Sequence, residues 1–119
     1  MNATTKTNPT TNNQTKSLHD SLVLLHQKLS SRLDSAASAD EADAIVREMQ
    51  EISFRVMITG GLLFKKTSQQ ISNNLQEVVS ATDQLKKDIS QIKTLKEMVR
   101  STSRLLGLVD KVLDKIKLL

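Results

Sequence analysis

Apolar residues recur at helical spacing in two short segments of the first half of the chain. Residues 17–35 carry a stripe with 4-3-4 spacing, formed by Leu18, Leu22, Leu25 and Leu29. Residues 39–58 carry a second stripe, formed by Ala42, Ile45, Met49, Ile52 and Val56. Ahead of it, Ser38 and Glu41 match a capping box, in which the serine hydroxyl accepts a hydrogen bond from a backbone N–H of the first turn. The pattern therefore predicts two helices, over about 17–35 and 39–58.

The second half of the chain carries the longest periodic signal. Every seventh position from 71 to 113 is apolar, which is typical of a helix that packs along one seam. A companion position follows four residues later up to residue 92 and three residues later beyond it, so the seam changes phase once, near Ile92–Leu95. We predict one long helix over 67–118. Its contact face would comprise Ile71, Leu75, Val78, Leu85, Ile89, Ile92, Val99 and Leu106.

The predicted helices differ in length. A continuous helix over 67–118 would extend about 75 Å, whereas each earlier helix would extend about 30 Å. If the two short helices form a hairpin on part of the long one, an apolar stripe lacks an intramolecular partner, and soluble proteins cover such stripes. The pattern therefore favours an all-α three- or four-helix bundle or coiled coil that associates with copies of itself or with another protein. Alternatively, poor helix formers within 101–107 break the long helix, and its last segment folds back to complete a four-helix bundle.

Composition supports the all-α class. The chain has 119 residues, which suits one domain, predicted over 17–119, and its aromatic residues are Phe54 and Phe64 alone. It contains three glycines and one proline, too few for the closely spaced turns of a β fold. It contains no cysteine, which excludes disulfides and thiolate metal sites.

The N-terminal segment differs from the rest of the chain. Residues 1–16, MNATTKTNPTTNNQTK, are mainly Thr and Asn, with two lysines and no acidic residue. This composition predicts a disordered tail, because no side chain after Met1 could anchor a core. The tail resembles the polar, uncleaved N-termini of bacterial type III secretion substrates, which implies a secreted protein or a component of the secretion apparatus. Since no apolar stretch suited to a cleavable signal follows Met1, the expected location is the cytoplasm, or the exterior without signal cleavage.

The segment MITGGLLFKKTS, residues 57–68, joins the second helix to the long one. From Gly60 it nearly matches the phosphate-binding loop G-x-x-x-x-G-K-[ST], but Lys65 replaces the second glycine. Such a loop needs close backbone approach to phosphate and follows a buried strand, whereas residues 45–58 are expected to be helical. We therefore interpret Gly60 and Gly61 as a hinge, with the next helix beginning at Thr67 or Ser68.

No catalytic constellation is apparent in the sequence. His19 and His26, the only histidines, would lie about 10 Å apart along a helix, too far for one metal ion. No cysteine nucleophile, no histidine beside a serine–carboxylate pair and no glycine loop around a cleft is present. The chain is therefore expected to be non-enzymatic, with no cofactor, no metal ion and no small-molecule substrate.

Charge and amphipathicity bear on two further partners. Net charge is +4, with the basic excess in the C-terminal part, but acidic residues interrupt the basic ones, which argues against nucleic acid. The apolar stretch 52–64 and the C-terminal helix suit a membrane surface, although both lack the Trp and Tyr typical of that position and the stretch is too short to span a bilayer. A peripheral membrane protein is thus an alternative to the predicted function, a helical interaction or scaffold protein.

Overall fold

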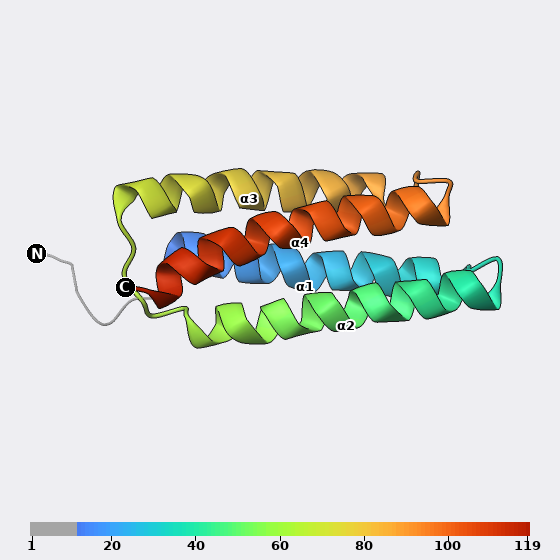
Figure 1. Ribbon diagram of the computed structural model, residues 1–119, viewed down its shortest axis with the longest axis horizontal. Coiled ribbons are helices and arrows are strands. Elements are labelled where there is room, and N and C mark those ends of the chain that lie inside the picture. Colours follow the sequence, from blue (N-terminus) through green and yellow to red (C-terminus); the bar gives the residue numbers. More distant parts are fainter. Residues whose placement is uncertain (1–11) are drawn as a thin grey trace, which may run out of the picture.

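In the computed structural model, which describes residues 12–119, the chain folds into four α-helices (Figure 1). They are α1 Asn13–Asp34, α2 Ala39–Gly61, α3 Gln69–Asp88 and α4 Leu95–Lys117, and the described residues contain no strand. Consecutive helices run in opposite directions. The predicted all-α class is confirmed, and the helices form a four-helix bundle.

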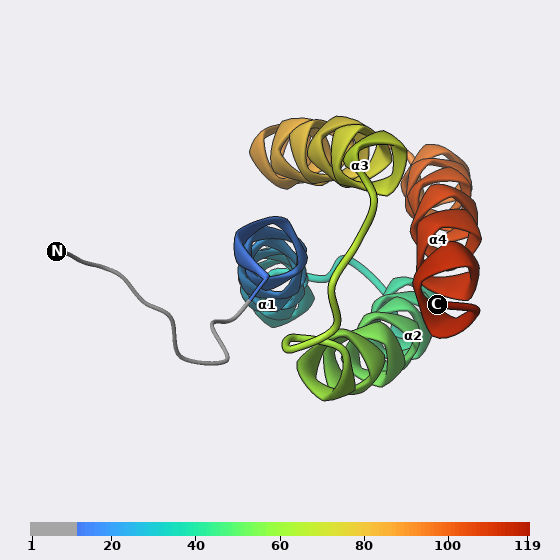
Figure 2. The same ribbon diagram turned by 90° about the vertical axis from the view of Figure 1, so that its left-hand side faces the viewer.

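Each helix packs against two neighbours. α1 contacts α2 and α3, and α4 contacts the same two helices. α1 and α4 therefore lie diagonally across the bundle, as do α2 and α3, and the loop at residues 62–68 crosses one end to connect the latter pair (Figure 2). The bundle consequently has two opposite faces, one formed by α1 and α2 and the other by α3 and α4.

The continuous helix expected over 67–118 is two helices, because residues 89–94 turn the chain back. α3 ends at Asp88, whose backbone carbonyl accepts from the N–H groups of Gln91 and Ile92. Thr94 then caps α4: its hydroxyl accepts from the N–H of Glu97 at 3.1 Å, which satisfies a donor of the first helical turn. The break lies ahead of the alternative one considered at 101–107, since those residues are helical.

Arg32 of α1 fixes the position of this turn. Its guanidinium donates hydrogen bonds to the carbonyl oxygens of Ile89, at 2.6 Å, and Ile92. Carbonyls at the end of a helix lack intrahelical partners, and positive charge is favourable there. Contact with α1 therefore stabilises the point at which the long periodic segment reverses direction.

α1 begins earlier than predicted. Asn12 is its N-cap, with a side chain that accepts from the N–H groups of Gln14 and Thr15. The Asn12 side-chain amide also donates to the Thr67 hydroxyl at 3.0 Å, which ties the start of α1 to the loop at 62–68. Residues 13–16, assigned to the tail by composition, are thus helical, and residues 1–11 of that predicted tail lie outside the described residues.

The predicted hinge is also displaced. Gly60 and Gly61 are the last residues of α2, whose C-cap is Leu62, so the chain turns at 62–68. A Cβ at Gly61 would meet no atom within 4 Å, and neither glycine is required by its surroundings. Because both glycines lie in the helix, their N–H groups do not form a phosphate cradle.

The helix starts follow the predicted capping chemistry. The Ser38 hydroxyl accepts from the N–H of Glu41 at 3.1 Å, which confirms the cap of α2. Ser68 caps α3 by accepting from the N–H of Ile71 at 3.2 Å, the second of the two predicted starts.

Aliphatic side chains from all four helices fill the core. The predicted stripe of α1 is fully buried along its whole length, as expected for the helix that faces both α2 and α3. The other fully buried large side chains are Ile45, Ile52, Leu75, Ile89, Met98, Val109, Leu113 and Ile116. Burial of such side chains contributes roughly 1.5–3 kcal/mol each, which makes this core the main source of stability.

Polar contacts join three of the four packed pairs of helices. His19 of α1 donates from Nδ1 to the Val56 carbonyl of α2 at 3.1 Å. The hydroxyl of Ser21, also on α1, donates to Asp83 of α3 at 2.6 Å and lowers the pKa of that carboxyl group.

Arg55 of α2 forms a two-pronged ion pair with Asp110 of α4, at 3.0 and 2.8 Å, and these hydrogen bonds raise the pKa of Arg55. Among the described residues no such side-chain contact joins α3 to α4, so apolar packing alone holds that pair together.

Candidate interaction surfaces

The residues predicted to form an intermolecular contact lie inside the bundle. Six of the eight are buried: Ile71, Leu75, Val78, Leu85, Ile89 and Leu106. Ile92 and Val99 are half-buried. The stripe has an intramolecular partner because the turn at 89–94 folds α4 back onto α3, and α1 packs against α3 from the other side. Contacts with other molecules therefore have to be sought among the exposed side chains.

Large apolar side chains are exposed on the outer side of α2. Phe54 is 54% exposed and Met57 67% exposed, and Val46 is exposed two turns before Phe54. We call these three residues the α2 ridge. Phe64, in the loop that follows, is 68% exposed, so both aromatic side chains of the protein lie at the surface. Single exposed apolar residues are ordinary, but a contiguous group of them marks an interaction site.

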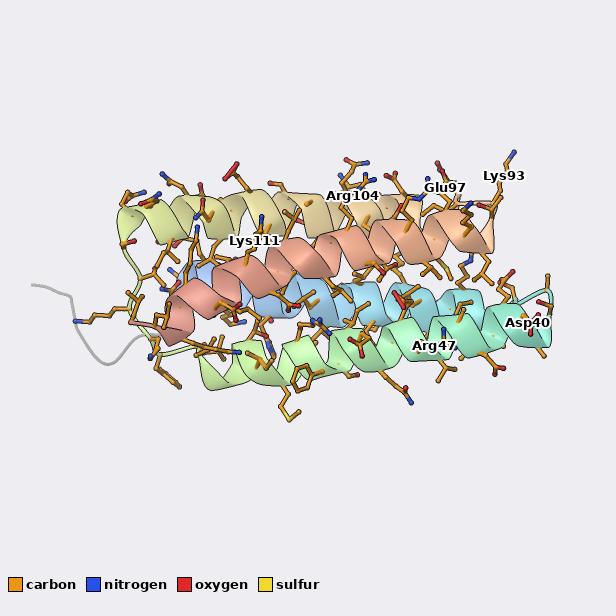
Figure 3. The ribbon with its side chains drawn as sticks, in the orientation of Figure 1. Asp40, Arg47, Lys93, Glu97, Arg104 and Lys111 are labelled. Atoms are coloured by element: carbon orange, nitrogen blue, oxygen red, sulfur yellow. The ribbon has the colours of Figure 1, made fainter. Side chains whose placement is uncertain are left out.

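A shallow groove between α1 and α2 adjoins the α2 ridge. Its lining comprises His26, Val46, Met49, Gln50, Ser53, Phe54 and Met57. Exposed acidic residues outnumber exposed basic ones on α2: Asp40, Asp43 and Glu51 are exposed, with Arg47 among them, and Figure 3 shows Asp40 and Arg47 on this helix. The segment 52–64, considered from the sequence as a membrane-surface element, thus has exposed apolar side chains.

The opposite face carries a second groove, between α3 and α4. One half is lined by Asn74, Glu77, Val78, Leu108, Lys111, Val112 and Lys115. The other half is lined by Ala81, Gln84, Leu85, Asp88, Ser101, Arg104, Leu105 and Leu108. Leu108 belongs to both halves and is 42% exposed. We call the combined feature the α3–α4 groove.

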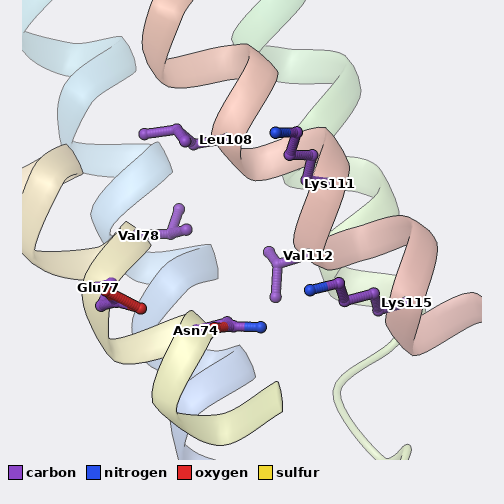
Figure 4. Close-up of a pocket in the computed structure, with 7 residues that line it drawn as sticks. All are labelled: Asn74, Glu77, Val78, Leu108, Lys111, Val112 and Lys115. Atoms are coloured by element: carbon purple, nitrogen blue, oxygen red, sulfur yellow. The ribbon is translucent and has the colours of Figure 1, made fainter. Parts of the chain in front are cut away.

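The two rims of the α3–α4 groove carry opposite charge. α4 contributes Arg104, Lys111 and Lys115, and α3 contributes Glu77 and Asp88. Figure 4 shows Lys111 and Lys115 on α4, and Asn74 and Glu77 on α3 at the other side of the groove. Among the described residues none of these five side chains forms an ion pair. The Asp88 carboxylate accepts hydrogen bonds from the Gln84 side-chain amide at 3.1 and 3.2 Å, but it has no cationic partner within residues 12–119, so all five charges are available to a molecule that enters the groove.

One carboxyl group is buried away from both surfaces. Glu48 is 6% exposed, and its Oε1 atom has no hydrogen-bond partner among the described residues. Burial raises the pKa of Glu48, because the charged form loses its hydration. This group bears on stability and its pH dependence.

No three His, Asp or Glu side chains of residues 12–119 are grouped as metal ligands. His19 is engaged with α2, whereas His26 lines the groove beside the α2 ridge. None of the helices described is both long enough and apolar enough to pass through a bilayer.

No protein-family description, no curated protein and no solved structure matches this chain. The surfaces themselves are therefore the basis for the function proposed below.

Proposed function

We propose that this chain is a non-enzymatic helical interaction protein, a scaffold component that binds another protein through the α2 ridge. The observation that carries the proposal is the placement of the aromatic residues. Phe54 and Phe64 are both more than half exposed, although the core is built from aliphatic side chains. Keeping such side chains in water has no benefit for folding, and their burial against a partner is favourable.

The residue types of the α2 ridge suit protein recognition. Aromatic residues and methionine are enriched in protein interfaces, and a few such side chains supply most of the binding energy. Met57 can adapt its unbranched side chain to an irregular surface. Val46, Phe54 and Met57 lie on one side of a regular helix, so a groove between helices of the partner is the shape that fits them.

Charge around the α2 ridge favours a protein over an anionic membrane. Asp40 and Asp43 are exposed near Arg47, and Glu51 forms an ion pair with Arg55 at 2.7 Å, so α2 has a small negative balance, which repels anionic headgroups and attracts a partner with basic residues beside its apolar groove. A helix that lies on a membrane surface typically has lysine and arginine on its polar face.

The proposal is tested with the double variant Phe54→Asp/Met57→Asp and a control, Gln69→Asp/Gln70→Asp, which adds the same charge at exposed positions of α3. The proteins serve as baits in an extract of the source cells. A retained protein is then purified and its affinity is measured by titration calorimetry. The ridge variant should bind about 30-fold more weakly, as expected for loss of about 2 kcal/mol at a binding hot spot, and the control should match the original protein.

Equal affinity of the ridge variant and the original protein for every purified partner would contradict the proposal. Flotation with anionic vesicles at low salt tests the membrane alternative on the same variants. Flotation of the original protein that the ridge variant loses would assign the α2 ridge to lipid instead.

A further inference from the structure

We propose that the α3–α4 groove is a self-association surface, on which two copies pack groove to groove around a two-fold axis parallel to the helices. This inference uses the face opposite the α2 ridge and does not depend on the proposed function. It rests on the shape of the groove, on the order of the charges along its rims and on the area that the face offers.

The shape provides an apolar centre. Leu108 is 42% exposed at the midpoint of the groove, and buried side chains of both helices, Val78, Leu85 and Val112 among them, form the floor. Two such faces brought together place each Leu108 against the floor of the other copy. The apolar contact removes from water a side chain that the single chain leaves half uncovered.

The charges are ordered in register along the groove. Glu77 lies in the same half as Lys111 and Lys115, and Asp88 lies in the same half as Arg104. Each half of the groove therefore carries opposite charges on its two rims, negative on α3 and positive on α4, without ion pairs between them among the residues that the structure describes.

Two-fold symmetry makes this order of charges complementary to itself. A two-fold axis parallel to the helices places α3 of one copy over α4 of the other while preserving the level along the bundle. Glu77 then faces Lys111 and Lys115 of the second copy, Asp88 faces its Arg104, and each contact occurs twice. An axis across the helices would place α3 over α3 and oppose like charges, so the charge order selects the parallel axis.

The area of the α3–α4 face sets the expected affinity of the dimer. α3 is about 30 Å long, and two adjacent helices about 10 Å apart present roughly 600 Å² of face. A symmetric pair would bury about 1,200 Å² in total, at the lower end of specific interfaces. We therefore expect a reversible dimer that forms in the micromolar range and weakens with added salt, because the rim charges are exposed to solvent.

Such a dimer would leave the α1–α2 faces outward on both sides. Two α2 ridges in one particle would bind a repetitive partner more tightly than one ridge, because the second contact becomes intramolecular.

A reciprocal charge exchange tests the arrangement. One variant, Glu77→Lys/Asp88→Lys, makes both rims positive, and the other, Arg104→Glu/Lys111→Glu/Lys115→Glu, makes both rims negative. The original protein should sediment as a concentration-dependent dimer, and each variant should be monomeric with an unchanged helical circular dichroism spectrum. An equimolar mixture of the two variants should restore a dimer, which native mass spectrometry should show to contain one copy of each.

Further variants separate this surface from the others. Leu108→Asp should abolish the dimer and should not be rescued by either rim variant. Asp114→Lys, a charge change on α4 outside the groove, should leave the dimer intact, as should Phe54→Asp/Met57→Asp.

A monomeric original protein at every concentration would overturn the inference, and so would a rim variant that still forms dimers alone. If two folded rim variants failed to associate with each other, the proposed pairing of the α3 rim of one copy with the α4 rim of the other would be overturned. If the ridge variant is monomeric while the rim variants dimerise, copies associate through the α2 ridge. The proposed function would then stand, with a second copy as the partner, and this inference would fail.

Discussion

The predicted contact stripe, which lies on α3 and α4, and the α2 ridge are both sets of apolar side chains on one side of a helix, but they lie in opposite environments. Leu75 of the stripe is fully buried between helices, whereas Phe54 and Met57 of the ridge are mostly in water. Periodicity shows which side of a helix is apolar and does not show what covers it. The longest stripe in the sequence therefore belongs to the core, and the shorter, less regular group on α2 is the surface that remains uncovered.

The two exposed faces also differ from each other. The α2 ridge projects from its helix and carries aromatic and thioether groups, which suits a foreign groove. The α3–α4 groove is concave, with charges of opposite sign on its two rims, which suits a surface identical to itself. Shape and charge thus distinguish two kinds of contact in one small bundle.

The largest expected effect tests the contrast between stripe and ridge directly. Leu75→Ala should lower the free energy of unfolding by about 2–5 kcal/mol, because a cavity replaces a fully buried side chain. Phe54→Ala removes a larger side chain but should cost less than about 1 kcal/mol, since that ring is half exposed. Urea denaturation of both variants gives the comparison. Similar losses of unfolding free energy in the two variants would show that Phe54 is as well packed as the stripe.

A smaller effect is expected from the buried carboxyl group. Burial raises the pKa of Glu48 above its ordinary value of 4.5, so the folded protein binds this proton more tightly than the unfolded chain does. Stability should therefore fall as pH rises from about that value through the raised pKa. Glu48→Gln should remove this loss and increase stability at pH 8, on the order of 1 kcal/mol.

Denaturation at pH 5 and pH 8 measures the Glu48 contribution as a difference between the two proteins. Asp83 contributes on the acid side only, because its pKa is lowered from 3.8 and its contribution is lost as pH falls through the lowered value. The difference in free energy of unfolding between Glu48→Gln and the original protein should widen toward pH 8. A constant difference would contradict burial of a charged group.

The smallest effect concerns the end of α2. Gly61→Ala should increase the free energy of unfolding by about 0.5–1 kcal/mol, because alanine loses less conformational freedom in a helix and its Cβ would meet no atom. A hinge that needs glycine would instead lose stability on this change. Thermal denaturation of Gly61→Ala decides between the two.

Much of the fold could be predicted from particular residues. The α1 stripe and the cap at Ser38 identify the first two helices, and both are present in the structure. The turn at 89–94 also had a signal: Thr94 and Glu97 form the same capping pattern as Ser38 and Glu41. The phase change of the seam near Ile92–Leu95, interpreted as an adjustment within one helix, falls at this turn.

The candidate surfaces could not be predicted from the sequence in the same way. The predicted stripe of residues 39–58 already leaves out Val46, Phe54 and Met57, but periodicity does not show whether another part of the chain covers apolar side chains that lie off the stripe. The rims of the α3–α4 groove combine residues that are distant in sequence, such as Glu77 and Lys111, and only the reversal of the chain brings them to the same half of the groove.

The sequence by itself determined that the chain is helical and which side of each helix is apolar, because these properties depend on spacing and capping within a few residues. The tertiary structure decided which apolar sides are covered. That outcome depends on where α3 ends, and contact between Arg32 of α1 and the last carbonyls of that region stabilises the turn. Packing between distant segments thus placed the stripe inside, the α2 ridge outside and the opposite charges across a single groove.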